Sequence, residues 1–228
     1  MENLDWNSFL QQFRWFQGEH LSIIGPTGSG KTTLLLNLLH CRKSVVIFAT
    51  KPEPPKDELE SNTLALYAKK ERYTKVSVWP PGNTRKVVLW PSFVRPGDEA
   101  RQKKVFTRAL MDIFVSRGWC VAVDELWYHT NRLGLNDLFE TYWSQGRELG
   151  LTIAAATQRP SHISLMFYSE PKHFFFYRLR NPNDRKRISE IASIDHKAVQ
   201  EKVMRLPDHY FLYLHAPSGR MIQSRVEL

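Results

Sequence analysis

The sequence of 228 residues contains little cysteine and no long apolar run. Cys41 and Cys120 are far apart and form no C-x-x-C pair, which argues against a metal centre or redox chemistry at paired thiols. No uninterrupted apolar stretch approaches the roughly 20 residues that a membrane-spanning helix needs. The N-terminus also lacks the basic start and apolar centre of a signal peptide. We therefore expect a soluble protein with reduced cysteines, located in the cytoplasm.

The composition is that of a single globular domain. With 42% hydrophobic and 24% charged residues, the chain can bury one core, and residues 1–228 are most simply one α/β domain. The formal net charge is +9, which favours polyanionic partners but does not bear on the fold.

The stretch GPTGSGKT has the spacing of a phosphate-binding loop, placed between an apolar run and a leucine-rich segment. A strand that ends at Ile24 and a helix that begins near Lys31 leave a turn whose backbone N–H groups can surround phosphates. Lys31 can reach the β- and γ-phosphates, and the Thr32 hydroxyl can bind Mg²⁺. The predicted nucleotide-binding residues are Gly25, Pro26, Thr27, Gly28, Ser29, Gly30, Lys31, Thr32 and Thr33.

Strands and helices alternate along most of the chain. The pattern predicts strands at 20–25 and 45–49, a helix at 31–41, and two apolar strands in WCVAVDEL and LTIAAATQ. Such alternation is typical of a mostly parallel central sheet flanked by helices, the RecA-like arrangement of P-loop NTPases. Further predicted elements are a weak strand at 76–79, helices at 58–70, 99–116, 135–149 and 183–194, a strand in HFFFYRL, and a C-terminal β-hairpin within 207–228.

Two segments stand apart from this alternation. Residues 1–19 have aromatic residues at helical spacing, which predicts an amphipathic helix before the first strand. Residues 79–98 are broken by prolines but contain tryptophans and basic residues, which predicts an irregular insertion. That insertion could contact nucleic acid or a neighbouring subunit, or it could pack against the domain through its tryptophans.

The run VAVDEL places two acids at the end of a buried strand. Asp124 is positioned to coordinate the Mg²⁺ held by Thr32, directly or through water. Glu125 then lies at the carboxyl edge of the sheet, where it can orient or deprotonate a water molecule. A carboxylate that activates water favours hydrolysis over phosphate transfer to another acceptor.

Gln158 ends a further apolar strand, TIAAATQ. If that strand lies beside the one that precedes the phosphate loop, the Gln158 amide can hydrogen-bond the γ-phosphate or the attacking water. It could then report which nucleotide is bound.

The motifs GPTGSGKT, VAVDE and GRELGLTIAAATQRPS resemble the FtsK/HerA branch of additional-strand, catalytic-glutamate ATPases. The resemblance covers residues 18–195. It implies a DNA-translocating ATPase that uses ATP and Mg²⁺ and assembles as a homo-oligomeric ring, usually a hexamer. In such rings a basic residue of the neighbouring subunit completes the site. Arg147 matches the position where the family often has an arginine, and Arg185 or Arg187 is the second candidate.

The chain is little larger than the motor domain of that family, a size similar to the genome-packaging ATPases of membrane-containing icosahedral viruses. We therefore expect a packaging ATPase acting on double-stranded DNA, in the host cytoplasm or associated with the virion, with capsid or membrane-vertex proteins as further partners. The basic loops 79–98 and 159–173 are candidates for contacts to the DNA backbone. The alternative is a phage morphogenesis ATPase that binds coat proteins and not DNA.

Overall fold

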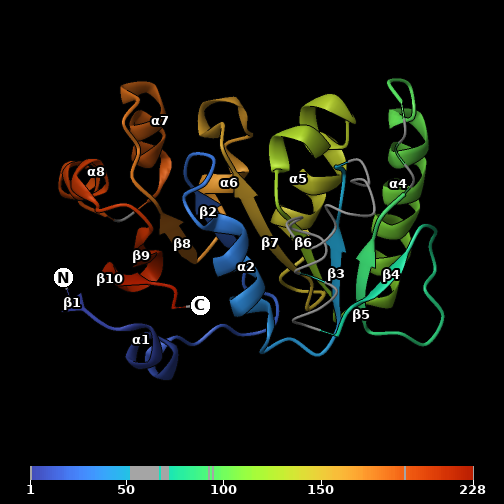
Figure 1. The fold of residues 1–228 in the computed structure, drawn as a ribbon, viewed down its shortest axis with the longest axis horizontal. Helices are drawn as coiled ribbons and strands as arrows, with labels where there is room; N and C mark the ends of the chain where they lie inside the picture. The colour runs from blue at the N-terminus through green and yellow to red at the C-terminus, as the bar shows by residue number, and fades with distance from the viewer. Residues whose placement is uncertain are drawn as a thin grey trace, which may run out of the picture.

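The computed structural model describes residues 2–51, 67, 72–91, 93, 95–192 and 194–227. These residues form one ten-stranded sheet with helices on both faces (Figure 1). Across the sheet the strands follow the order β1-β10-β9-β8-β2-β7-β6-β3-β5-β4. The strands are β1 (Glu2–Asn3), β2 (Leu21–Ile24), β3 (Val45–Phe48), β4 (Thr74–Val76), β5 (Lys86–Leu89), β6 (Cys120–Val123), β7 (Thr152–Thr157), β8 (His173–Phe176), β9 (Tyr210–His215) and β10 (Arg220–Arg225).

Seven adjacent strands, from β8 across to β4, are parallel to one another. Every residue of β2, β3, β6, β7 and β8 is buried, as expected for parallel strands covered on both faces. The C-terminal strands β9 and β10 form an antiparallel hairpin that continues the sheet beside β8. The predicted mostly parallel sheet with a C-terminal hairpin is confirmed.

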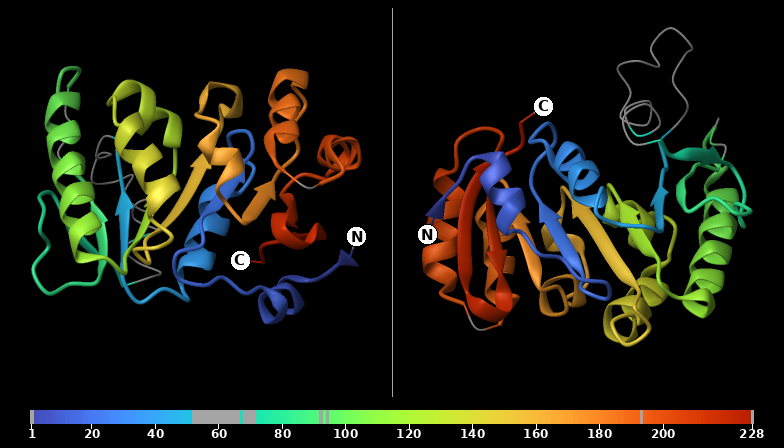
Figure 2. Two further views of the ribbon diagram at one scale, coloured as in Figure 1. Left: turned by 180° about the vertical axis from the view of Figure 1, so that it is seen from behind. Right: turned by 90° about the horizontal axis from the view of Figure 1, so that it is seen from below.

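The helices divide between the two faces of the sheet (Figure 2). Residues of α1 and α2 pack on one face, and residues of α4, α5, α6 and α8 pack on the other. No helix among the described residues is long and apolar enough to cross a membrane. The helices are α1 (Trp6–Gln12), α2 (Lys31–Leu39), α4 (Glu99–Ser116), α5 (Asn136–Gln145), α6 (Met166–Ser169), α7 (Pro182–Lys186) and α8 (His196–Arg205).

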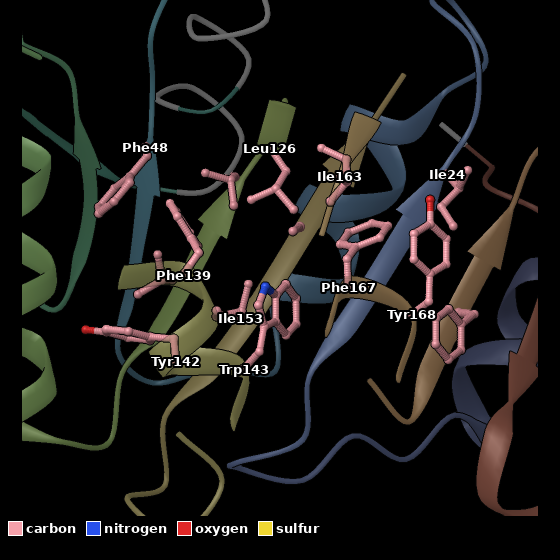
Figure 3. Close-up of a cluster of buried hydrophobic side chains, with 14 of the residues drawn as sticks. Ile24, Phe48, Leu126, Phe139, Tyr142, Trp143, Ile153, Ile163, Phe167 and Tyr168 are labelled. Atoms are coloured by element: carbon pink, nitrogen blue, oxygen red, sulfur yellow. The ribbon is translucent and has the colours of Figure 1, made fainter. Parts of the chain in front are cut away.

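The larger of the two core clusters lies on the side of the sheet that α5 covers (Figure 3). Phe139, Tyr142 and Trp143 of α5 are buried with Ile153 of β7 in this cluster. The Tyr142 hydroxyl donates a hydrogen bond of 2.6 Å to the Leu110 carbonyl, so its polar atom is satisfied in the core. Burial of such large side chains contributes about 1.5–3 kcal/mol each and holds β7 in place.

Several boundaries differ from the sequence-based expectation. The segment 79–98 is not irregular throughout, because β5 lies within it and pairs with both β3 and β4. Prolines on both sides of this strand interrupt the strand pattern in the sequence, so the strand was not predicted. The predicted helix 135–149 ends at Gln145, and 183–194 is a short α7 followed by a 3₁₀ turn. The predicted helix 58–70 lies outside the described residues except for Tyr67.

The N-terminal and C-terminal segments also differ from expectation. Within 1–19 the helix covers only Trp6–Gln12, and Phe16 beyond it is 66% exposed. Helix α8 was not predicted; Asp195 caps its N-terminus by accepting a hydrogen bond from the Ala198 backbone.

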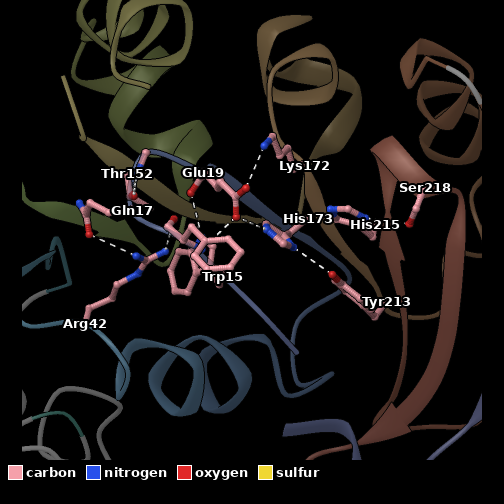
Figure 4. Close-up of polar contacts among 12 residues, drawn as sticks. Trp15, Gln17, Glu19, Arg42, Thr152, Lys172, His173, Tyr213, His215 and Ser218 are labelled. Carbon is pink, nitrogen blue, oxygen red and sulfur yellow. Dashed lines mark hydrogen bonds and ion pairs between the residues drawn. The ribbon is translucent and has the colours of Figure 1, made fainter. Parts of the chain in front are cut away.

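A polar network fixes the amino ends of β2 and β8 and the carboxyl end of β9, which is antiparallel to β8 (Figure 4). Glu19 accepts hydrogen bonds from Lys172 Nζ at 2.8 Å, from His173 Nε2 at 3.1 Å and from the Phe16 backbone at 2.9 Å. His173 Nδ1 accepts from the Tyr213 hydroxyl at 2.9 Å. Burial lowers the pKa of His173 to about 4, which keeps this histidine neutral at pH 7.

Glu19 remains ionised within this network. Its partial burial raises its pKa, but the hydrogen bonds from Lys172, Phe16 and His173 outweigh that effect and bring the pKa to about 2. The network therefore anchors the start of β2. The other end of this strand leads into the phosphate loop.

We expect Glu19→Gln to lower the free energy of unfolding by about 1–3 kcal/mol at pH 7, because Lys172 and His173 lose a charged partner. The folded pKa of Glu19, about 2, lies below its ordinary value of 4.5. Its contribution is therefore full above about pH 4.5 and is lost as the pH falls toward 2. Urea unfolding of both proteins at several pH values should show their difference shrinking in that window; a constant difference would contradict the assignment.

Candidate functional site

The ends of three neighbouring parallel strands meet at one edge of the sheet. Strand β7 lies between β2 and β6, with Ile24 paired to Thr157 and Val123 paired to Ala155. This register places the phosphate loop after β2, Gln158 after β7, and the Asp124–Glu125 pair after β6 at the same edge. The convergence predicted from the sequence is confirmed.

Glycine geometry shapes the loop between β2 and α2. Gly28 and Gly30 have φ values of +75° and +103°, which side chains rarely adopt. At Gly25, a Cβ atom would lie 2.6 Å from the Cβ of Tyr177 and 3.0 Å from the Ser29 hydroxyl oxygen. No side chain caps the first turn of α2, so its backbone N–H groups remain available to an anion.

Lys31 is 5% exposed, and its Nζ donates a hydrogen bond of 2.7 Å to the Pro26 carbonyl inside the loop. Burial lowers the pKa of Lys31, while the carboxylates of Asp124 and Glu125 act in the opposite direction. The structure thus brings a buried cation, held by the loop itself, close to two acids.

Thr32 and Asp124 are in direct contact, with the Thr32 hydroxyl donating to Asp124 Oδ1 at 2.6 Å. Both line a cavity of about 320 Å³ together with Lys31, Lys51 and Gln158. A hydroxyl and a carboxylate oxygen are ligands that suit Mg²⁺, so the residues present fit the predicted metal. The sequence did not indicate whether Lys51 lies at this site; the structure places it in the lining of the cavity.

Glu125 is bound to the end of β7 through both of its carboxylate oxygens. Oε1 accepts from the Thr157 hydroxyl at 3.1 Å, and Oε2 accepts from the Gln158 backbone N–H at 3.1 Å. Burial raises the pKa of Glu125, although these hydrogen bonds and Lys31 act to lower it. The side chain borders a small void of about 30 Å³ beside Asp124 and is not among the residues lining the phosphate cavity.

The Gln158 side chain lies over the phosphate loop. Its Oε1 accepts a hydrogen bond of 2.5 Å from the Thr27 hydroxyl. Because the Gln158 backbone also holds Glu125, this one residue connects the loop to the acid. The structure therefore brings together Lys31, Thr32, Asp124, Glu125 and Gln158, as the sequence predicted.

The predicted arginines lie elsewhere. Arg147 is next to Gly18, before β2 begins, so within its own chain it is at the opposite edge of the sheet from the loop. Arg185 donates to the Leu179 carbonyl, and Arg187 donates to the Ile163 carbonyl and lies over the Tyr168 ring. None of the three joins the loop of its own chain, and a role in a neighbouring subunit's site stays a prediction.

Sequence reasoning missed several residues around the site. Tyr177, after β8, packs beneath the loop, and Tyr67 is 2% exposed at the small void that Asp124 borders. His129 donates from Nδ1 to the Glu125 carbonyl at 3.0 Å, since a carbonyl oxygen can only accept. Burial lowers the pKa of His129 to about 4 and keeps the ring neutral. It lies in a π-helix, Tyr128–Arg132, a form often found at functional sites. Arg178, in the HFFFYRL stretch, and Arg180, just after it, line a cavity of about 550 Å³ on the other side of the loop.

The loop, the strand order and the paired acids define a P-loop nucleotide-binding fold. Two solved structures share it over almost their whole length. B204, the DNA-packaging ATPase of Sulfolobus turreted icosahedral virus, is 20% identical, with 93% of this chain and 100% of that chain covered and a TM-score of 0.68. The genome-packaging NTPase B204 of Sulfolobus turreted icosahedral virus 2, in complex with sulfate, is 17% identical, with 94% and 99% covered and a TM-score of 0.69.

A more distant neighbour is EssC (ATPases 2 and 3) of Geobacillus thermodenitrificans, 14% identical, with 89% of this chain and 39% of that chain covered and a TM-score of 0.55. No family profile and no curated protein matches the sequence. The resemblance to FtsK/HerA ATPases is thus confirmed at the level of the fold.

We expect Gly25→Ala to weaken the binding of inorganic triphosphate, because the added methyl group would collide with Tyr177 and displace the loop. Overpacking of this kind costs about 1–3 kcal/mol of stability. Gly118→Ala is the control: with φ of +69° at Gly118 an alanine strains the backbone before β6, away from the loop, but its methyl group would have no described heavy atom within 4 Å. Calorimetric titration should show weaker triphosphate binding for the first variant only; equal binding by both would contradict the role of Gly25.

Proposed function

We propose that the protein hydrolyses ATP, with Mg²⁺ held by Thr32 and Asp124. The observation that carries this proposal is the position of Glu125, which is fixed at the same strand edge as Lys31 and Asp124. A phosphate loop alone is compatible with binding without turnover. A partly buried carboxylate beside it supplies the general base that hydrolysis requires.

The roles of the chain's own residues follow from their contacts. The loop N–H groups and Lys31 bind and orient the phosphates, and Gln158, over the loop, can contact the terminal phosphate or the attacking water. Glu125 takes the proton from that water through a carboxylate oxygen, which requires release from Thr157 or from the Gln158 N–H. Bound Mg²⁺ would neutralise charge on the phosphate oxygens. A neighbour's arginine, with Arg147 as first candidate, would stabilise the charge that develops on the transferred phosphate.

The cargo that the charge distribution favours is double-stranded DNA. Residues 72–117 contain ten Lys/Arg and three Asp/Glu, a net charge of +7 out of the chain's +9. Lys75 and Arg85 in this segment lie over the rings of Trp90 and Trp119. Trp90 itself is 4% exposed, so the tryptophans pack inward while basic side chains stay on the surface. Such a surface suits the phosphate backbone and reads no bases.

Genome packaging by a homo-oligomeric ring is the process that best combines these features, and the fold shared with B204 supports it. Capsid or membrane-vertex proteins would then be the fixed partners against which DNA is moved. Protein handling is the second candidate, because EssC and the type VII secretion ATPase EccC of Thermomonospora curvata have the same core fold. A morphogenesis ATPase that acts on coat proteins belongs to this second class.

We expect Glu125→Gln to reduce ATP hydrolysis by about 10²–10⁴-fold while leaving ATP binding intact, because the amide cannot take a proton. Glu201→Gln, which neutralises an exposed acid of α8 that lines neither cavity beside the loop, should change neither property. Since the pKa of Glu125 is raised by burial, the wild-type rate should fall on the acid side with a midpoint above pH 4.5. Steady-state hydrolysis and equilibrium binding measure both effects; unchanged turnover in Glu125→Gln would rule out this base.

We expect duplex DNA to stimulate hydrolysis, with a stimulation that weakens as salt is raised because basic residues contact phosphates. The rate per subunit should also rise steeply with protein concentration if a neighbour's arginine completes each site. Hydrolysis measured against protein concentration, with and without duplex DNA, tests both points. Stimulation by coat protein and none by DNA would favour the second candidate function.

A further inference from the structure

Lys51 is a second lysine at the phosphate cavity. It follows β3, which pairs in parallel with β6, so the chain reaches the same edge of the sheet as Asp124 (Figure 1). Its side chain lines the cavity of about 320 Å³ together with Lys31 and Thr32. Lys31 belongs to the glycine-rich loop motif, whereas Lys51 belongs to no motif. The roles given above to the residues of the site leave Lys51 without one.

Two buried side chains fix the backbone beside this lysine. Trp90 is 4% exposed, and its Nε1 donates a hydrogen bond of 2.7 Å to the Lys51 carbonyl. Gln102 of α4 is fully buried, and its amide nitrogen donates to the Thr50 carbonyl at 3.0 Å. The amide oxygen of Gln102 accepts from the Tyr128 hydroxyl at 3.0 Å, so both ends of the amide have partners. The side chain of Lys51 therefore starts from a fixed point beside the cavity.

The positive charge of Lys51 is not balanced within the described part of the chain. Its side chain is exposed and forms no ion pair with a described residue. Burial is the main cause of the lowered pKa of Lys31, and the positive charge of Lys51 lowers that pKa further. Two cations that line one cavity repel each other unless an anion lies between them. A phosphate group between the two lysines would remove this repulsion.

The position of Lys51 favours the terminal phosphate over the inner ones. Lys51 and Asp124 border both the phosphate cavity and the small void beside Glu125. They therefore lie on the side of the phosphate cavity that is nearest the proposed base. Hydrolysis requires that base, and the water it activates, to be next to the terminal phosphate.

We propose that Lys51 contacts the terminal phosphate of bound ATP and stabilises the negative charge that develops there during hydrolysis. This inference rests on the proposed function, because it requires ATP in the phosphate loop. Unlike the arginine of a neighbouring subunit, this cation belongs to the same chain as the loop. Each chain would thus have a positive charge at the terminal phosphate before any neighbour contributes one.

The test compares the non-hydrolysable ATP analogue AMPPCP with ADP, which lacks the terminal phosphate, by calorimetric titration in the presence of Mg²⁺. We expect Lys51→Met to weaken AMPPCP binding about tenfold, the loss expected for one hydrogen bond to a charged group. ADP binding should be unchanged. Lys51→Arg keeps the charge and should bind AMPPCP more tightly than Lys51→Met. Both variants should fold, because the backbone hydrogen bond from Trp90 does not involve the substituted side chain.

Lys202→Met is the matched control. Lys202 is an exposed lysine of α8 that lines none of the cavities beside the loop, so this variant should bind both ligands like the wild type. ATP hydrolysis at saturating ATP should be slower in Lys51→Met and unchanged in Lys202→Met.

The inference is overturned if Lys51→Met binds AMPPCP as tightly as the wild type or hydrolyses saturating ATP at the wild-type rate. It is also overturned if AMPPCP and ADP binding weaken by the same factor, because Lys51 would then act on the inner phosphates. A wild-type protein that binds neither ligand would overturn the proposed function itself. Normal wild-type binding and turnover with an unaffected Lys51→Met variant would remove only the role of Lys51.

Discussion

The parallel alignment of β2, β7 and β6 is the constraint on which the site depends. Parallel strands end at the same edge of a sheet, and here Ile24 pairs with Thr157 and Val123 with Ala155, so the three strands end within two residues of one another. A cationic loop, an amide and two acids are consequently held together by backbone pairing rather than by loop conformation. The buried cores on both faces keep these strands in register.

The opposite edge of the sheet is fixed by different chemistry. There Glu19, ionised and hydrogen-bonded to Lys172 and His173, ties the start of β2 to the start of β8. Tyr213 extends the same network to β9. Strand β2 is thus held at its amino end by the polar network and leads into the phosphate loop at its carboxyl end.

The sequence predicted the site better than the periphery, for physical reasons. Glycine spacing and acids at strand ends are local patterns tied to chemistry, so Lys31, Asp124, Glu125 and Gln158 could be identified without coordinates. The short strand β5 could not, because its pairing partners are distant in sequence and prolines surround it. Tyr177 was missed because its relation to the loop exists only once β8 lies beside β2.

The double role of Gln158 has a mechanical consequence. Its side chain is hydrogen-bonded to the loop and its backbone N–H to Glu125, and the polypeptide continues from it directly into segment 159–173, whose Phe167 and Tyr168 are buried in the core. A displacement of that segment would therefore reach Glu125 through a single peptide unit. If the protein moves a load as proposed, tension on the segment would change the rate of hydrolysis directly.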